Sequence, residues 1–311
     1  MTLTEKVKRK ALDLGFQVVG ISRVTSDRPE SARLAEWLTR GYHGEMNWMA
    51  RTAAKRKNPA LLLPGIRSIV SLGMNYYTDD RPDGGPGQGR IARYARGKDY
   101  HRVLGQRLES LASFLQAEAP DSRSLAHVDT GAVMEKAWAQ RAGLGWIGKH
   151  SNLVSGQYGS WLLLGEVLTT AELSPDEPGA DLCGTCTLCM KSCPTGAITE
   201  PYVVDARRCL SYLTIEQRGH VPEEFQAALG NYVFGCDDCL DVCPYNHQAT
   251  PTAEPAFRAT PLTLNPDLDG LARQSAEEFR AAFRGSAVRR AGHEGLRRSA
   301  AIARKNGRGA R

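Results

Sequence analysis

The spacing of hydrophobic residues alternates between helical and extended patterns along the first 170 residues. Residues 4–14 repeat apolar side chains at helical intervals and stop near Gly15, which predicts an amphipathic helix. Residues 16–24 alternate loosely and are rich in β-branched side chains, which predicts a strand. Further helices are predicted at residues 29–38, 100–117 and 133–142, and further strands at residues 66–73, 125–128 and 161–168. This order predicts an α/β or α+β catalytic domain, with an exposed Gly- and Pro-rich loop at residues 79–89.

All eight cysteines lie in the next segment, between residues 183 and 243. The first four form a C-x2-C-x2-C-x3-C run followed by proline, which is the bacterial ferredoxin signature for iron–sulfur ligation. A C-x2-C-x3-C run, also followed by proline, lies at residues 236–243, and Cys209 stands between the two runs. Because two [4Fe–4S] clusters need eight thiolates, the cysteine count matches two clusters with none left over.

In the ferredoxin pattern, the fourth cysteine of a run serves the other cluster. The predicted ligands of one cluster are therefore Cys183, Cys186, Cys189 and Cys243. The predicted ligands of the other cluster are Cys193, Cys209, Cys236 and Cys239. Structural zinc is the alternative, because paired C-x2-C units also bind zinc, although the proline-terminated spacing suits a cluster better. Disulfides fit less well, because no signal-peptide pattern opens the chain and clustered thiols in a cytosolic protein favour metal.

Two clusters imply electron transfer, but a chain of 311 residues is far longer than an electron carrier requires. Hydrophobic residues make up 41% and charged residues 24% of the chain, as in an ordinary globular protein. No run approaches the ~18 apolar residues that span a bilayer. We therefore expect a cytoplasmic protein of two or three domains, without a membrane span.

Positive charge is concentrated near the C-terminal end. From residue 280 onward, ten Lys or Arg residues stand against one acid, whereas the whole chain has a formal net charge of only +6. Two helices are predicted there, at residues 277–283 and 292–303. A basic end on a mildly acidic body indicates a binder of polyanions, and a solvated terminus is the alternative.

Two motifs in the catalytic part have competing interpretations. Residues 143–148 match G-x-G-x-x-G, but they follow a predicted helix instead of a strand, so the context for dinucleotide binding is missing. Asp129 follows a predicted strand and stands close to Gly131, a position where catalytic groups are common. The alternative, which the local sequence alone favours, is that Asp129 or Thr130 caps the helix beginning near Val133.

Five blocks of sequence match one known family in the same order. The longest is V-D-T-G-x-V-x-E-x-x-W-A-x-x-A-G-L-G-W-I-G-K-x-S at residues 128–151. The others are M-N-W-M-A at 46–50, R-Y-A-R-G-x-D-Y-H at 93–101, C-L-S-Y-L-T-I-E at 209–216 and G-S-A-V-R-R-A-G at 285–292. Together they cover roughly residues 5–300, and they resemble the epoxyqueuosine reductases.

The resemblance implies an α+β fold of three parts. An α/β-type cobalamin-binding catalytic domain, like that of reductive dehalogenases, would occupy residues 1–178. A ferredoxin-like module with two [4Fe–4S] clusters would occupy residues 179–250, and a short, basic helical region residues 251–311. Many members of the family continue into a helical-repeat domain that helps to grip tRNA. The chain ends at Arg311, so we expect either a naturally short form or a cut sequence.

The resemblance also implies the reaction and the partners. Such an enzyme reduces epoxyqueuosine to queuosine at the tRNA wobble position, with cobalamin that the clusters reduce. Its partners would be tRNA bearing epoxyqueuosine and an external low-potential electron donor, and we expect a monomer. An organohalide reductase is an alternative, although the chain lacks the twin-arginine signal usual in that class. An electron carrier without a substrate of its own is another.

Several residues acquire expected roles from the matched blocks. Asp129 resembles the catalytic acid, which would protonate the departing epoxide oxygen if burial keeps its pKa high. The expected cobalamin contacts are Arg93, Asp129, Lys149, Ser151, Asn152 and Ser211. The expected tRNA phosphate contacts are Arg289, Arg290, Arg297 and Arg298.

Two further features bear on how cobalamin would be held. Asp99 and His101 begin the cobalamin signature D-x-H-x-x-G, but Leu104 replaces its glycine. A cobalt without a lower imidazole ligand is easier to reduce, so this departure agrees with the expected chemistry. Trp138 and Trp146 are expected to pack in the core instead of forming a surface for the cofactor.

Overall fold

A four-stranded antiparallel sheet forms the centre of the N-terminal part of the molecule. The structure, a computed structural model, describes residues 1–25 and 28–309. The strands are β1 (Val18–Arg23), β2 (Ser68–Asn75), β7 (Leu162–Thr169) and β4 (Ser124–His127). They lie side by side in the order β1-β2-β7-β4, and every neighbouring pair is antiparallel. The four apolar segments predicted as strands are therefore confirmed, with small shifts at their ends.

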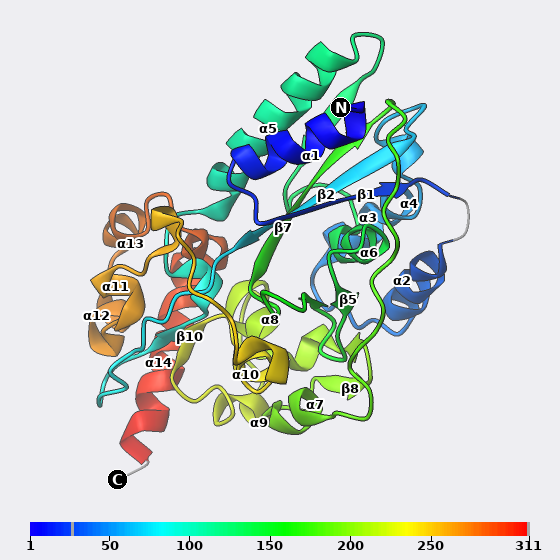
Figure 1. The fold of residues 1–311 in the computed structure, drawn as a ribbon. Coiled ribbons are helices and arrows are strands. Elements are labelled where there is room, and N and C mark those ends of the chain that lie inside the picture. Colours follow the sequence, from blue (N-terminus) through cyan, green and yellow to red (C-terminus); the bar gives the residue numbers. More distant parts are fainter. Residues whose placement is uncertain (26–27, 310–311) are drawn as a thin grey trace.

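Helices cover both faces of this sheet, as Figure 1 shows. Helices α1 (Leu3–Asp13) and α5 (Tyr100–Glu118) pack on one face. Gly165 of β7 permits a close approach there, because a Cβ at this position would lie only 2.5 Å from a methyl carbon of Leu108. Helix α6 (Glu135–Arg141) packs against β1, β2 and β7 on the other face, where Trp138 is buried beside Leu168.

Shorter elements flank the sheet. Helices α2 (Pro29–Thr39), α3 (Asn47–Arg51) and α4 (Ala53–Lys57) lie between β1 and β2 in the chain. The G-x-G-x-x-G segment runs out of α6 into the hairpin of β5 (Trp146–Ile147) and β6 (Leu153–Val154). Gly145 has a φ of 155°, and a Cβ there would lie 2.0 Å from the carbonyl oxygen of Val154. Close backbone packing therefore accounts for this glycine, and the segment lacks the strand-to-helix turn of a dinucleotide site.

The cysteine-rich segment consists of short elements. They are α7 (Leu188–Ser192), β8 (Ile198–Glu200), β9 (Val203–Val204), α8 (Leu210–Ile215), α9 (Glu223–Gln226), β10 (Tyr232–Phe234) and α10 (Asp238–Asp241). Strand β10 pairs in parallel with β3 (Arg90–Ile91), which precedes α5 in the chain. This pairing ties the cysteine-rich segment to the part of the chain that carries the sheet.

The C-terminal helices share a hydrophobic core with the cysteine-rich segment. They are α11 (Pro261–Leu264), α12 (Leu268–Arg273), α13 (Ala276–Ala282) and α14 (Gly292–Gly309). Leu296 of α14 is fully buried in the same core as Leu213 of α8 and Phe234 of β10. The two helices predicted in this region are confirmed, and α14 is longer than predicted (Figure 1).

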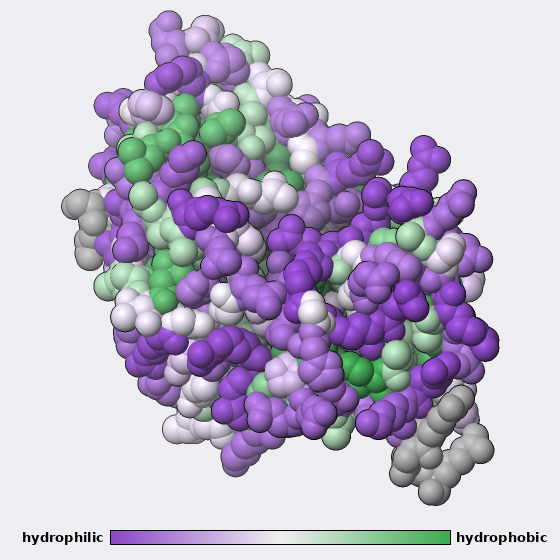
Figure 2. All heavy atoms as spheres, turned by 180° about the vertical axis from the view of Figure 1, so that it is seen from behind, coloured by the Kyte–Doolittle hydropathy of each residue, from purple (hydrophilic) through white to green (hydrophobic). Residues whose placement is uncertain are grey.

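Single turns of 3-10 helix complete the secondary structure. They are η1 (Pro59–Leu61), η2 (Arg93–Ala95), η3 (Ala206–Arg208), η4 (Pro244–Asn246), η5 (Pro255–Phe257) and η6 (Ala287–Ala291). Within residues 1–25 and 28–309, every helix is too short or too polar to cross a bilayer. The face in Figure 2 is mostly hydrophilic, with hydrophobic residues gathered in small patches.

Candidate active site

Asp129 lies in a loop directly after the edge strand β4, where two side chains from α5 bind it. The hydroxyl of Tyr100 donates to Asp129 Oδ2 at 2.7 Å, and His101 Nε2 lies 3.0 Å from the same oxygen. The φ of Asp129 is 51°, in the left-handed region that non-glycine residues rarely adopt. Helix α6 begins only at Glu135, and no side chain caps it at Met134. The helix-cap interpretation is therefore wrong, and Asp129 is held by contacts with α5.

The protonation of this pair differs from the expectation. Burial acts to raise the pKa of Asp129, but the hydrogen bonds from His101 and Tyr100 outweigh it and the pKa is lowered. Burial likewise acts to lower the pKa of His101, but its hydrogen bonds to Asp129 and Asp99 raise the pKa to about 9. The expectation that burial keeps the pKa of Asp129 high is therefore wrong. At neutral pH the proton resides on His101, beside the Asp129 carboxylate.

The first turn of α5 orients these groups. Asp99 caps the helix by accepting from the backbone N–H of His101 at 3.0 Å, and its side chain also lies 2.7 Å from His101 Nδ1. The imidazole thus bridges two carboxylates and stacks on Tyr100, with the ring centroids 4.1 Å apart. The residues that resembled the start of a cobalamin signature therefore hold the candidate acid instead.

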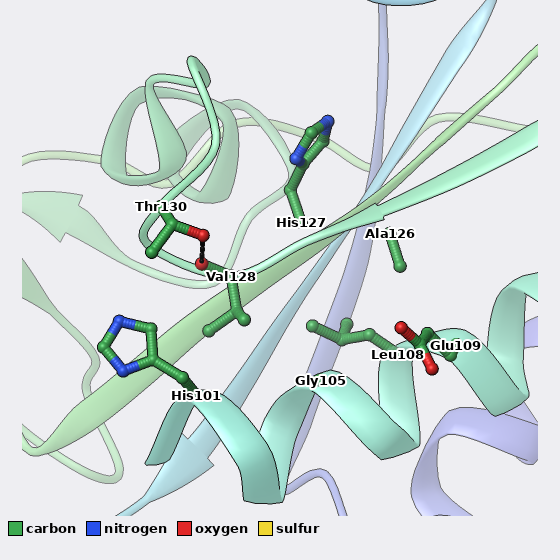
Figure 3. A pocket seen from close by; sticks show the side chains of 8 residues that line it. All are labelled: His101, Gly105, Leu108, Glu109, Ala126, His127, Val128 and Thr130. Atoms are coloured by element: carbon green, nitrogen blue, oxygen red, sulfur yellow. Dashed lines mark hydrogen bonds between the residues drawn. The ribbon is translucent and has the colours of Figure 1, made fainter. Parts of the chain in front are cut away.

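A cavity of about 370 Å³ opens beside this group, between α5 and β4 (Figure 3). Its lining includes His101 from the first turn of α5 and, from β4 and the following loop, His127 and Thr130. Figure 3 shows His127 directed to the face of the sheet opposite to α5, whereas Ala126 is directed toward α5. The hydroxyl of Thr130 donates to the carbonyl oxygen of Val128 at 3.2 Å, which closes the turn that presents Asp129.

The structure gathers the eight cysteines into two groups. All are free thiols. Burial raises the pKa of the Cys189 thiol, and the charges of Cys183, Cys243 and Cys186 raise it further. Burial also raises the pKa of Cys239, to which the charges of Cys209, Cys236 and Cys193 contribute. Each of these two thiols is thus influenced by the other three members of its predicted set, although within residues 1–25 and 28–309 no three of the sulfurs are placed as a bound metal ion would hold them.

Protein groups that stabilise sulfur charge surround both sets. The indole N–H of Trp146 donates to Cys183 Sγ at 3.4 Å, and the backbone N–H of Ala197 donates to Cys193 Sγ at 3.2 Å. Lys149 donates to the carbonyl oxygens of Gly184 and Cys186, at 2.6 and 2.8 Å, and so fixes the loop of the first run. Four cysteines in each set, with N–H donors to sulfur, suit an iron–sulfur cluster, which binds them as thiolates.

Lys136 on α6 lies between the candidate acid and the second thiol group. Its side chain is solvent-exposed, yet the surrounding protein lowers its pKa, while the charges of Asp129, Cys239 and Cys209 act in the opposite direction. Lys136 is therefore an accessible cation, and we call the surface formed by Lys136, Ser151 and Asn152 the polar patch. Its ammonium group donates to the carbonyl oxygen of Ser151 at 2.8 Å and to the side chain of Asn152 at 3.1 Å.

The expected cobalamin contacts thus divide into two classes. Ser151 and Asn152 lie at the polar patch with Lys136. Sequence reasoning missed Lys136, although it stands in the longest matched block. Asp129 lies in the loop described above, and the other three are engaged elsewhere, Lys149 at the cysteine loop. Arg93 is bound to Asp241 of α10 at 2.5 Å and stacks over a tryptophan ring, and Ser211 hydrogen-bonds the Cys209 thiol.

The four arginines near the C-terminus also differ in their surroundings. Arg289 is exposed, and Arg297 is partly exposed beside Glu294. Arg290 binds Glu216 through two nitrogens at 2.8 Å and lies close enough to Asp129 for its charge to lower the pKa of that carboxyl. Arg298 donates to three backbone carbonyl oxygens around the end of α8, so its guanidinium stabilises the fold. Arg311, part of the predicted basic tail, lies outside the described residues.

Comparison with known proteins identifies the family. A family model described as "4Fe-4S double cluster binding domain" matches residues 182–246, and one described as "Epoxyqueuosine reductase QueG, DUF1730" matches residues 56–130. The epoxyqueuosine reductase of Synechococcus sp. (strain CC9605) is 45% identical over 306 residues, which cover 97% of this chain and 94% of the relative. The chain belongs to the epoxyqueuosine reductase family. The family member of Escherichia coli (strain K12) is 42% identical, over 98% of this chain and 81% of its own length.

Solved structures of epoxyqueuosine reductases have the same fold. A crystal structure of one with an epoxyqueuosine-modified tRNA-Tyr stem loop matches 98% of this chain and 81% of its own, with 33% identity and a TM-score of 0.92. The Bacillus subtilis epoxyqueuosine reductase, with its catalytic loop swung out of the active site, matches 99% of this chain and 82% of its own. Its identity is 32% and its TM-score 0.91. The predicted α+β fold with a two-cluster module is therefore confirmed.

Proposed function

We propose that this chain reduces epoxyqueuosine in tRNA to queuosine. The observation that carries the proposal is the bonding of Asp129 by Tyr100 and His101, near Lys136, which the charges of both Asp129 and the second thiol group influence. Electrons and an acid are both needed at the same substrate, because the epoxide oxygen has to leave as water. Family membership supports the choice of substrate, since relatives that are more than 40% identical are named epoxyqueuosine reductase.

The acid in this proposal is the Asp129–His101 pair, not Asp129 alone. His101 holds a proton up to about pH 9, and Asp129 accepts from it through the same oxygen that Tyr100 binds. A departing alkoxide near Asp129 draws that proton from His101, directly or through the shared oxygen. Asp99 holds the other ring nitrogen, so the imidazole keeps its orientation when it is deprotonated.

We propose that the two thiol groups hold two [4Fe–4S] clusters and that cobalamin binds at the polar patch. One set is Cys183, Cys186, Cys189 and Cys243, and the other is Cys193, Cys209, Cys236 and Cys239. When bound, cobalamin supplies a reduced cobalt nucleophile for the epoxide carbon. Lys136, Ser151 and Asn152 would hold its polar edge, because they are accessible polar groups between Asp129 and the second thiol group.

The remaining parts have supporting roles in the proposal. Residues 1–178 form the cobalamin-binding part, residues 179–250 the cluster module and residues 251–311 the basic helical region. Arg289 and Arg297 would bind tRNA phosphates, whereas Arg290 lies nearer the reacting base because of its proximity to Asp129. We propose that the protein acts in the cytoplasm as a monomer and takes electrons from an external low-potential donor.

The test is anaerobic turnover of a defined substrate. The protein, with its clusters intact and cobalamin added, is incubated with a chemical reductant and an epoxyqueuosine-modified tRNA stem loop. Mass spectrometry of the digested nucleosides should find the loss of one oxygen atom, only when both cobalamin and reductant are present. Conversion without cobalamin, or none when both cofactors are spectroscopically intact, would contradict the proposal.

A further inference from the structure

A row of polar side chains crosses the sheet behind the Asp129 loop. Glu166 of β7 is paired in register with Ser71 of β2 on one side and with His127 of β4 on the other. Residues paired in this way direct their side chains to the same face of an antiparallel sheet. That face is the one covered by α6, because the adjacent Gly165 faces α5. The interior under α6 therefore contains an acid, a hydroxyl and an imidazole in one line.

These groups are buried without the partners that such groups normally have. Glu166 is 0% exposed, and neither of its carboxylate oxygens has a hydrogen-bond partner among residues 1–25 and 28–309. The same holds for the Ser71 hydroxyl, for His127 Nε2 and for Oε1 of Glu135 at the start of α6. A carboxylate in this position would be strongly disfavoured as an anion, whereas a protonated carboxyl group can donate to its neighbours.

Glu135 connects this row to the candidate acid. Burial raises the pKa of Glu166, and the charge of Glu135 raises it further. Burial also raises the pKa of Glu135, and the charge of Asp129 adds to that effect. Glu135 is partly buried and follows Asp129 by six positions, at the first residue of α6. The charges of Glu166, Glu135 and Asp129 thus influence one another in sequence, from the buried Glu166 through the partly buried Glu135 to the exposed Asp129.

Burial and the charge of Asp129 raise the pKa of Glu135, and they outweigh the charges of Arg56 and Lys136, which act to lower it. Arg56 of α4 donates to the carbonyl oxygens of Val133 and Gly131, at 2.6 and 3.2 Å. Lys136 donates to the hairpin loop after β5, away from Glu135. Burial lowers the pKa of His127, so this imidazole is neutral at physiological pH. His127 is partly exposed on the edge strand β4, which gives the row a route to solvent.

We propose that Glu166 and Glu135 hold a shared proton behind the Asp129 loop and deliver it to the Asp129–His101 pair during turnover. This inference rests on the function proposed above. Opening one epoxide to an alkene consumes two electrons and two protons, because the oxygen leaves as water. The clusters supply the electrons, and His101 supplies the first proton. In the step assigned here, the O–H bond of Glu135 breaks and the proton passes through ordered water to the pair. A new proton then enters from solvent through His127 to Glu166, which passes it to the Glu135 carboxylate.

The stored proton can be detected without any turnover. The infrared spectrum of the protein at pH 7.5 should contain the carbonyl band of a protonated, buried carboxyl group. This band should disappear in Glu166→Gln and shift in Glu135→Gln, and it should be unchanged in Glu224→Gln, whose glutamate is exposed on α9. Thermal melts of each variant verify that it is folded. A wild-type spectrum without the band, or a band that survives Glu166→Gln in a folded protein, overturns the proposal.

The relay itself is tested by kinetics on the complete enzyme. Glu135→Gln should lower kcat about tenfold or more and enlarge the solvent deuterium isotope effect, because proton delivery becomes slower. The KM for the modified stem loop and the iron content should stay as in the wild type. Unchanged kcat and isotope effect in Glu135→Gln would overturn the relay. A wild-type enzyme that is inactive on the epoxide would instead count against the proposed function, so the two failures are distinguishable.

Discussion

Replacing Asp129 with asparagine removes one charge and leaves the shape of the active-site loop intact. Asparagine tolerates a φ of 51° better than most residues, so Asp129→Asn keeps the backbone where the structure has it. The side chain is 60% exposed, and an exposed ion pair contributes about 0–1 kcal/mol, so the free energy of unfolding should change by no more than about 1 kcal/mol. General acid–base catalysis contributes about 10²–10⁴-fold, so the turnover of epoxyqueuosine should fall about a hundredfold or more.

The neighbouring imidazole reports whether this reasoning is right. The hydrogen bond to Asp129 is one of two that raise the pKa of His101 to about 9, so the pKa of His101 should fall in Asp129→Asn, while Asp99 keeps part of the shift. A histidine pKa that is raised in the folded state stabilises the protein at low pH, and this contribution is lost as pH rises through about 9. In the variant the loss should be smaller and should be complete at lower pH. NMR titration of the His101 ring and melting temperatures across this range measure both effects.

The assay compares Asp129→Asn with Asp121→Asn, an exposed aspartate at the other end of β4. Both variants are loaded with clusters and cobalamin, verified by their absorption spectra, and supplied with the modified stem loop and a chemical reductant. The Asp121 variant should match the wild type. If Asp129→Asn retains more than about a tenth of wild-type turnover with both cofactors bound, Asp129 is not part of the acid.

Three more outcomes are expected. The purified protein should contain about eight iron and eight sulfide ions per chain, and Cys209→Ala should contain about half as many. A single zinc ion, or an iron content that Cys209→Ala leaves unchanged, would disprove the ligand sets. Arg289→Ala and Arg297→Ala should each reduce the slope of log affinity for tRNA against log salt by about 0.7–0.9, whereas Arg298→Ala should lower the melting temperature because three backbone carbonyl oxygens lose their donor. Equal slopes in all three variants would mean that tRNA binds elsewhere. With the wild type at saturating stem loop, kcat should decline as pH rises through about 9, because His101 loses its proton; a rate that stays constant to higher pH would show that His101 is not the donor.

The parts of the fold that sequence could predict are those with a repeated pattern. Helix α5 and strand β7 carry enough apolar residues at a regular spacing to be located almost to the residue. The pairing of β3 with β10 has no such pattern, because each strand is two or three residues long and their partner lies about 140 positions away. The cysteine spacing predicted the two-cluster module, because the ferredoxin pattern is specific to such clusters, and it also predicts which cluster each thiol serves.

The sequence singled out Asp129 for the candidate site, but it did not predict the protonation state of this residue. Asp129 could be singled out from its position after a strand, but its partners come from a helix that begins 29 residues earlier and meets it only in the folded chain. Those partners reverse the direction of its pKa shift, which no local sequence rule contains. The same limit explains why Lys149 was preferred over Lys136. Both stand in the longest matched block, and only the fold places Lys149 at the cysteine loop and Lys136 at the polar patch.

The position of α14 has a consequence for the biosynthesis of the protein. A ribosome makes this helix after the cysteine-rich segment, yet its Leu296, Ala300 and Ala303 are nearly fully buried in the core that supports α8 and β10. The cysteines at residues 209 and 236 flank those two elements, so they leave the ribosome before the core behind them can close. We therefore expect the second cluster to be inserted only after α14 has been made. Nascent chains stalled before α14 should remain without their second cluster, however much iron and sulfide the cell supplies.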